Sequence, residues 1–246
     1  MLALAAGCVP EGPPTKGAKG RGATTPPARS VVPAQRTSTP RTVDSAAPPS
    51  PPLSGPFEDR FDRERLGPDL RALSPVWQVV DGELCGQGAK NRGVWLRRAL
   101  PVDARIEFDA RSESPDGDIK AEYWGDGRSG ATAVSYTDAT SYLTILGGWK
   151  NSRHVLARID EHAPDRLALQ VDRQSPDRRA WPVEPGQTYR FRVERSDGNT
   201  LSWWVDDELY FELADTEPLS GQGHDHFGFN NWTVPVCFDN LKITPL

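Results

Sequence analysis

Residues 188–205 read Thr188-Tyr-Arg-Phe-Arg-Val-Glu-Arg-Ser-Asp-Gly-Asn-Thr-Leu-Ser-Trp-Trp-Val205. Apolar and polar side chains alternate in two runs, which is the period of a half-buried β-strand. The segment between the runs, Ser-Asp-Gly-Asn, is made of turn-forming residues and predicts a reversal of the chain. Asp206 and Asp207 predict a second tight turn, into a third strand over 209–213. This stretch therefore predicts an antiparallel meander whose core-facing residues are Tyr189, Phe191, Val193, Leu201, Trp203 and Val205.

Strand patterns of the same kind fill most of the chain from Phe57 to the C-terminus, and no segment there has a convincing helical period. An Asp81-Gly82 pair interrupts the pattern over 77–85 and predicts a hairpin. The other predicted strands cover 105–111, 119–124, 142–146, 153–159, 167–171, 226–232 and 236–243. Some ten to twelve strands and no helix predict an all-β protein of two packed antiparallel sheets.

The first 56 residues have a different composition from the rest of the chain. Twelve of the 23 prolines lie between Val9 and Pro56, where there is no aromatic residue, and all eight tryptophans lie beyond this segment. A segment that buries so little apolar area cannot offset the entropy of ordering. We therefore expect a disordered, Pro-rich linker over residues 9–56 and one folded domain over residues 57–246.

Charge is divided unevenly between these two parts. The linker has six basic and two acidic residues, a net charge of +4, and the whole chain has a net charge of −5, so the domain carries about −9. Such an acidic domain does not favour the clustered lysines and arginines that contact nucleic-acid phosphates. The composition therefore argues against nucleic acid as the main partner.

The chain begins Met1-Leu-Ala-Leu-Ala-Ala-Gly-Cys8, a short apolar run that ends in a cysteine. This run resembles the end of a bacterial lipoprotein signal peptide, whose cysteine is lipidated after cleavage. Ala5 stands where leucine is usual and no positive segment precedes the run, which indicates a start codon further upstream. The resemblance implies that residues 1–8 are a signal-peptide remnant and that the domain is exported to the cell envelope, lipid-anchored through Cys8, or secreted. The alternative is a free cysteine at a frayed terminus.

Two further cysteines, Cys85 and Cys237, fall in predicted strands near the two ends of the domain. An exported domain allows them to form a disulfide. Two buried free thiols fit the sequence equally well, because spacing alone does not bring the two strands together.

Short motifs at both ends of the domain fit one known pattern. They are Phe57-Glu-Asp-Arg-Phe-Asp62, the strand from Trp77 to Leu84 and the closing Phe238-Asp-Asn-Leu-Lys-Ile243. With the Tyr-x-Phe-x-Val-x-Arg strand and the Trp-Val-Asp-Asp hairpin, they resemble the concanavalin A-like lectin and glucanase superfamily, which includes laminin-G-like domains. The resemblance covers residues 57–246 and implies a two-sheet jelly roll. Members bind carbohydrates, cleave them or serve as adhesive modules, so the fold leaves the function open.

The catalytic motif of these glucanases is Glu-x-Asp-x-(x)-Glu on one strand, because retaining hydrolysis needs two closely spaced carboxyls. The sequence has one Glu-x-Asp, at Glu107-Phe-Asp109, and the next glutamate on that face, Glu113, is too far along the strand. We expect Glu107 and Asp109 to belong to a solvated face of alternating charge. The resemblance therefore does not extend to the catalytic residues.

A second pair of carboxylates, Asp118 and Glu122, flanks Lys120 next to Trp124. A lysine between two carboxylates favours their ionised forms, which is the opposite of what a general acid needs. We expect Glu122 to accept hydrogen bonds from sugar hydroxyls, with Lys120 and Trp124 on the same face of the strand.

Three other segments carry candidate ligand-binding residues. The alternation in 226–232 places Asn230 and Trp232 opposite the apolar Phe227 and Phe229. Gly147-Gly148 can bend the chain so that Trp149 and Asn151 are presented at a strand edge, or it can form a wide bulge whose tryptophan caps the core. His154 is either a hydrogen-bonded structural residue or a base. The full predicted set is Glu122, Trp124, Trp149, Asn151, His154, Asn230 and Trp232.

Two acidic segments and three histidines are the candidates for metal binding. The acidic, glycine-rich segments Asp116-Gly-Asp118 and Asp126-Gly127 resemble calcium loops, although ordinary turns use the same residues. The histidines His162, His224 and His226 do not form a zinc pattern with a fourth ligand. We predict no metal site, with calcium as the one open alternative.

Taken together, the sequence favours a carbohydrate-binding or adhesive module on a lipid tether, without catalysis and with a poly- or oligosaccharide as partner. The first alternative is a glycoside hydrolase or lyase with a non-standard site built from Glu122, Asp118 or His154. The second is a structural envelope protein whose exposed aromatic residues contact another protein.

Overall fold

The computed structural model describes residues 52–246. The predicted signal-peptide remnant 1–8, the lipidation site Cys8 and nearly all of the predicted linker lie outside the described residues. Residues just before Phe57 already contact the domain, because Leu53 is buried and its backbone N–H donates to the carbonyl of Ala99 at 2.9 Å. Among residues 52–246, no helix has both the length and the apolar character to cross a membrane.

Eight strands form one antiparallel sheet, called sheet A, in which the order is β13-β12-β11-β6-β15-β4-β3 and β1 pairs with β15. Its strands are β1 (Phe57–Asp59), β3 (Gln78–Val80), β4 (Glu83–Gly86), β6 (Ala104–Ser112), β11 (Thr188–Arg195), β12 (Thr200–Val205), β13 (Glu208–Ala214) and β15 (Val236–Pro245).

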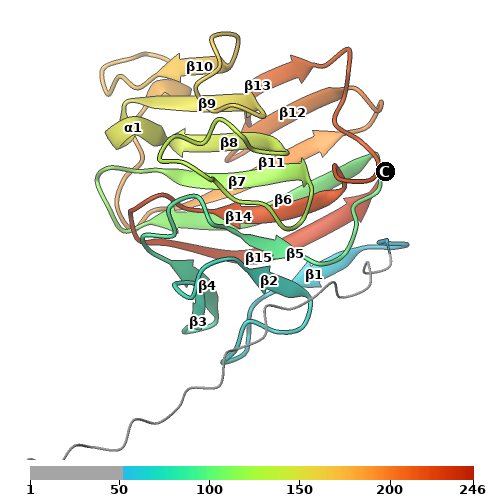
Figure 1. Cartoon of the computed structure of the whole chain (residues 1–246). Coiled ribbons are helices and arrows are strands. Elements are labelled where there is room, and N and C mark those ends of the chain that lie inside the picture. Colours follow the sequence, from blue (N-terminus) through green and yellow to red (C-terminus); the bar gives the residue numbers. More distant parts are fainter. Residues whose placement is uncertain (1–51) are drawn as a thin grey trace, which may run out of the picture. The chain divides into compact units, whose positions relative to one another are not determined.

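Seven strands form the second antiparallel sheet, sheet B, in the order β10-β9-β8-β7-β14-β5-β2. Its strands are β2 (Leu70–Ala72), β5 (Val94–Leu96), β7 (Ile119–Gly125), β8 (Tyr142–Gly147), β9 (Arg153–Arg158), β10 (Leu167–Gln170) and β14 (His226–Asn230). Figure 1 shows the two sheets as packed layers, so the predicted all-β, two-sheet architecture is confirmed.

The predicted meander forms the edge of sheet A. Strands β11, β12 and β13 pair in sequence, with Phe191 opposite Val205 and Val193 opposite Trp203. All six residues predicted to face the core are buried. The short turn at Asp206-Asp207 needs two left-handed residues, and their φ values are 51° and 65°.

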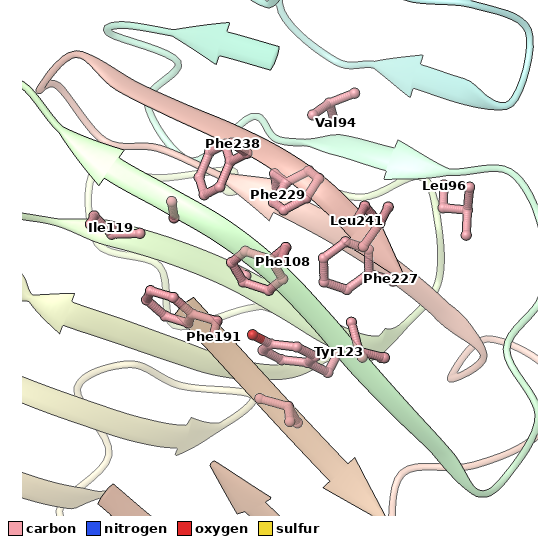
Figure 2. Packing of buried hydrophobic residues seen from close by; sticks show 14 of the residues in the cluster. Val94, Leu96, Phe108, Ile119, Tyr123, Phe191, Phe227, Phe229, Phe238 and Leu241 are labelled. Atoms are coloured by element: carbon pink, nitrogen blue, oxygen red, sulfur yellow. The ribbon is translucent and has the colours of Figure 1, made fainter. Parts of the chain in front are cut away.

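Aromatic side chains from both sheets meet in the core, as Figure 2 shows for Phe108, Phe191, Phe229 and Phe238. Phe108 of sheet A stacks on Phe191 at 4.9 Å between ring centroids and meets Phe229 of sheet B edge-on at 5.1 Å. Phe229 stacks on Phe238 at 4.3 Å. The predicted inward orientation of Phe227 and Phe229 is confirmed, because each side chain is 1% exposed.

The two cysteines of the domain form a disulfide. The predicted hairpin turns at Asp81-Gly82, where both residues are left-handed, and leads into β4. In β4, Cys85 lies directly opposite Cys237 of β15, and the sulfur atoms of the two are bonded. The bond therefore links a strand from the start of the domain to its last strand.

A bulge in β7 changes the predicted face of Trp124. Gly125 pairs with His226 and Glu122 with Gly228, so two residues of β7 oppose one residue of β14, and Trp124 has a φ of 51°. Trp124 consequently turns into the core and is 1% exposed, and its indole N–H donates to the carbonyl of Pro101. The prediction that this tryptophan faces solvent beside Glu122 is wrong.

The connection between β7 and β8, residues 126–141, covers the outer face of sheet B and is called the cover loop (Figure 1). Its Tyr136 is buried in a small second cluster with Ala139, Leu143, Ile145, Val155 and Ala157. Because of this loop, Glu122 and Asn230 are fully buried on a face that the alternation alone predicts to be open to solvent. The prediction of a solvent-facing Asn230 is therefore wrong.

Candidate functional site

An open pocket of about 370 Å³ lies at one end of sheet B, and we call it the tryptophan pocket. It brings together Trp149 and Trp232, two of the predicted ligand-binding residues, from separate connections. The residues that line it are Asp116, Asp118, Lys120, Val134, Ser135, Ile145, Trp149, Lys150, Glu161, His162, Trp232, Thr233 and Val234.

A left-handed turn places Trp149 at the pocket. Trp149, Lys150 and Asn151 in α1 (Gly148–Asn151) have φ values of 50°, 59° and 57°, which L-residues rarely adopt in succession. Gly147 precedes the turn with a φ of 71°, and a Cβ there would lie 2.7 Å from the Asn151 side chain. The surrounding structure must hold this conformation against its cost of about 1–2 kcal/mol per residue. Such a costly turn that presents an indole to a pocket is typical of a binding site.

Asn151 holds this turn in place. Its side-chain amide donates to the carbonyls of Pro115 and Val183 at 3.0 and 2.8 Å, and its oxygen accepts from the N–H of Val183 at 2.9 Å. Both amide hydrogens are used inside the protein. Asn151 therefore supports Trp149, and the structure places it outside the lining of the pocket.

His154 supports the same turn from the buried side. The backbone N–H of Gly147 donates to its Nδ1 at 2.9 Å, so the proton of the neutral ring is on Nε2, which donates to the carbonyl of Trp181 at 3.0 Å. Burial lowers the pKa of His154 to about 4, against a weaker opposing effect of the Trp181 carbonyl. The neutral ring is therefore the resting form, and its two nitrogens are engaged by backbone groups.

Trp232 is held by contacts between the β14–β15 connection and the segment before β5. The N–H of Lys90 donates to the carbonyl of Trp232 at 3.0 Å, and the N–H of Asn91 donates to the carbonyl of Asn231 at 2.9 Å. The buried side chain of Asn231 accepts from the N–H of Ala89 and donates to the carbonyl of Val234. Asn231 therefore fixes the backbone that carries this half-buried indole.

A buried ion pair forms part of the pocket lining. The ammonium of Lys120 donates to Glu161 at 2.6 Å and to Asn91 at 2.9 Å. Burial raises the pKa of the neighbouring Asp118 to about 6, with a smaller contribution from Glu161, while Lys120 and the N–H of Trp232 act against this rise. As the sequence predicts, the attraction of Lys120 lowers the pKa of both Asp118 and Glu122, but burial acts more strongly and the net shift of both pKa values is upward.

Glu122 lies beneath the cover loop and is not part of the pocket lining. Its carboxyl accepts hydrogen bonds from Tyr136 at 2.9 Å, from Ser141 at 2.6 Å and from the amide of Asn230 at 2.5 Å. Tyr136 and Ser141 belong to the cover loop and Asn230 to β14. Glu122 and Asn230 therefore fasten the loop to the sheet, and neither meets a ligand in this arrangement.

Stability is expected to fall as the pH rises from about 4.5 to 7. Burial raises the pKa of Glu122 to about 7, above the value of about 4.3 for an unfolded glutamate. Between these values the folded protein retains a proton that the unfolded chain releases, so this contribution is fully present below about pH 4.3 and is lost as the pH rises through about 7, at most about 4 kcal/mol. Urea titrations of the protein and of Glu122→Gln at several pH values isolate the effect. A pH dependence that Glu122→Gln leaves unchanged would contradict it.

Within residues 52–246, the one cluster of three potential metal ligands is Glu83 with Cys85 and Cys237, whose sulfurs are already joined. Asp126, from a predicted calcium-like loop, accepts hydrogen bonds from the backbone N–H groups of Arg128 and Ser129 and so stabilises its own turn. Asp116 and Asp118 line the tryptophan pocket. The absence of a metal site stays a prediction, with calcium as the open alternative.

Solved structures of other proteins resemble the fold of this domain. No model of a known protein family matches the sequence, and no curated protein matches it. Among solved structures, the carbohydrate-binding module CBM66 from Bacillus subtilis is similar, with a TM-score of 0.50, 14% identity and coverage of 71% of this chain and 94% of the other.

Two further similar structures are a lectin-type domain and an enzyme. The carbohydrate recognition domain of Emp47p has a TM-score of 0.53 and 12% identity, and covers 77% of this chain and 94% of its own. The β-glucanase of Bacillus licheniformis has a TM-score of 0.52 and 8% identity, and the match covers 78% of this chain and 99% of the other. At these identities the likeness shows the fold, a concanavalin A-like jelly roll, as the sequence motifs predict.

Proposed function

From this jelly-roll fold and the tryptophan pocket, we propose that the protein is a carbohydrate-binding module that does not cleave its ligand. The observation that carries the proposal is the meeting of Trp149 and Trp232 in one open pocket among polar groups. The similar structures include a carbohydrate-binding module and a carbohydrate recognition domain, which supports a saccharide ligand.

The pocket has the chemistry that sugars require. Indole rings stack on the C–H faces of sugar rings, and a few directed polar groups select among isomers. Here Ser135, Thr233 and Asp116 are exposed at the pocket and can meet hydroxyl groups. Its volume of about 370 Å³ lies at the lower end of the range of small-molecule sites. A short segment of a polysaccharide is therefore the ligand we expect.

The proposed absence of cleavage is supported by how the carboxylates are engaged. Glu161 is engaged in a buried ion pair with Lys120 at 2.6 Å. Glu122 is fully buried beneath the cover loop. Of the carboxyls that line the pocket, Asp118 is the one with a raised pKa.

Asp118 also supports the second candidate function, a glycoside hydrolase. Its pKa of about 6 is in the range of a general acid that works near neutral pH, and Glu161, which also lines the pocket, would be its partner. A reducing-end assay on every polysaccharide that the protein retains separates the two functions. New reducing ends that disappear in Asp118→Asn would replace the binding proposal with the hydrolase.

Replacing either pocket tryptophan is expected to weaken glycan binding roughly 30-fold, or about 2 kcal/mol, because each substitution removes a stacking surface. Trp149→Ala and Trp232→Ala are measured by affinity electrophoresis against a polysaccharide panel. Trp181→Ala is the matched control, since this indole is 43% exposed and lies outside the tryptophan pocket. If the control loses as much affinity as the two pocket variants, the ligand does not bind where we propose.

We extend the proposal to the location of the protein, namely the cell envelope with a lipid on Cys8. Its support is the apolar run that ends in Gly7-Cys8, followed by the Pro-rich segment. The test is labelling with a fatty-acid analogue after expression of the gene with its upstream sequence. Label in the protein and none in Cys8→Ser is the expected result, and equal label in both would contradict it.

A further inference from the structure

Basic side chains surround the two tryptophans of the pocket. The ammonium of Lys90 lies 4.3 Å from the ring centroid of Trp232. The guanidinium groups of Arg153 and Arg166 lie 5.4 and 5.6 Å from the ring centroid of Trp149. Lys150 is exposed and lines the pocket directly. We call these four residues the basic collar: Lys90, Lys150, Arg153 and Arg166.

No residue of the basic collar has a carboxylate within 4.0 Å in the part of the chain that the structure describes. Elsewhere in this part of the chain, some arginines, such as Arg63 and Arg105, pair with acidic residues at 2.6 and 2.7 Å, and others, such as Arg192, do not. The Nε atoms of Arg153 and Arg166 are also buried without a hydrogen-bond partner, like that of Arg192, while an Nη of Arg166 donates to the carbonyl of Ala163 at 2.8 Å. Buried polar atoms of this kind are uncommon in proteins and call for an explanation.

The acidic residues of the pocket do not supply the missing partners. Glu161 is engaged by Lys120 at 2.6 Å and lies 3.4 Å from the ring of His162. Asp118 lies beside Lys120 and the backbone N–H of Trp232, both of which lower its pKa, although burial raises that pKa overall to about 6. Asp116 is exposed at the opening. Lys150 therefore lines the pocket, and three further cations, Lys90, Arg153 and Arg166, lie against its two indole rings, in a domain whose net charge is about −9.

Like charges that share one small surface repel each other, and Arg153 and Arg166 contact the same ring. An anion bound in the pocket beside Lys150 reduces this repulsion and offers acceptors to the cationic groups that it reaches. A neutral sugar does neither. The arrangement therefore favours a ligand that combines sugar rings with negative charge.

We propose that the ligand of the tryptophan pocket is an anionic polysaccharide, whose carboxylate or sulfate groups pair with the basic collar while its rings contact Trp149 and Trp232. This inference rests on the proposed carbohydrate binding and adds the class of ligand.

The test compares ligands that differ only in charge. The full chain is titrated with polygalacturonate and with its methyl-esterified form, and in a second arm with chondroitin sulfate and its desulfated form. We expect the charged member of one pair to bind at least tenfold more tightly at 50 mM salt, with affinity that falls as salt rises. The arm in which this difference occurs identifies carboxylate or sulfate as the recognised group.

The variants are Lys150→Met and Arg166→Met, which keep the apolar stems of the side chains. Each is expected to lose most of the preference for the charged ligand while still binding the neutral form. Arg65→Met is the control, because Arg65 is exposed and lies outside the tryptophan pocket.

Three results would overturn the proposal. Equal affinity for the charged and neutral members would leave carbohydrate binding intact and refute the charge preference. Equally tight binding of poly-glutamate would mean that charge alone is recognised. No binding of any polysaccharide would refute the proposed function together with this inference.

Discussion

Glu122→Ala is expected to lower the free energy of unfolding by about 4 kcal/mol at pH 5. The substitution leaves three buried polar groups without their partner: the amide of Asn230 and the hydroxyls of Tyr136 and Ser141, one of which accepts the proton of the neutral carboxyl at this pH. Each unsatisfied donor costs about 1–3 kcal/mol, and water that enters the vacated space recovers part of this. Urea denaturation measures the change. A pH of 5 is chosen because the carboxyl, with a pKa of about 7, is then uncharged in the folded protein.

Glu122→Ala is also expected to affect the tryptophan pocket, because the cover loop forms part of its wall. Val134 and Ser135 line the pocket next to Tyr136, so release of Tyr136 loosens that wall. We expect weaker glycan binding together with faster proteolysis within residues 126–141. Glu122→Gln is the control, since its oxygen can still accept from Asn230 while the two hydroxyls rotate to accept from its amide. Loss of less than 1 kcal/mol in Glu122→Ala would mean that Glu122 does not hold the loop.

Local patterns were sufficient to predict most of the longer strands and the two-sheet class, but not the sheet that each strand joins. The alternation in residues 188–205 and 105–111 depends on which side chains are buried in each strand, and the Asp81-Gly82 turn depends on two adjacent residues. The bulge at Trp124 could not be predicted in this way. It arises from the register between β7 and β14, which are distant in the sequence, and one extra residue in β7 reverses the face of this side chain.

Two of the seven predicted ligand-binding residues, Trp149 and Trp232, line the pocket. Their glycine-rich and amide-rich surroundings mark unusual backbone, which is a local signal. The partners of Lys120 had no such signal, because Asn91 and Glu161 are 29 and 41 residues away in the sequence. The burial of Glu122 and Asn230 depends on the cover loop, whose sequence has no strand or helix period.

Removal of the Cys85–Cys237 disulfide is expected to lower the free energy of unfolding by about 4 kcal/mol. The two cysteines are 152 residues apart, so the bond closes most of the domain into one loop. Such a cross-link restricts the unfolded chain, and the restriction grows with the length of the loop. The measurement is guanidinium denaturation of the oxidised protein and of the double variant Cys85→Ala and Cys237→Ala.

The slope of the unfolding free energy against denaturant concentration distinguishes an effect of the disulfide on the unfolded chain from an effect on the folded protein. Without the cross-link the unfolded chain expands and exposes more surface, so the slope of the free energy against denaturant is expected to increase. Reductant should destabilise the protein and leave the double variant unchanged, while Cys8→Ser should retain the full response to reductant. Because β15 pairs with β1, β4 and β6, loss of the bond leaves the sheet intact at low denaturant. An unchanged slope with the same loss of stability would locate the effect in the folded state, in the packing around β4 and β15.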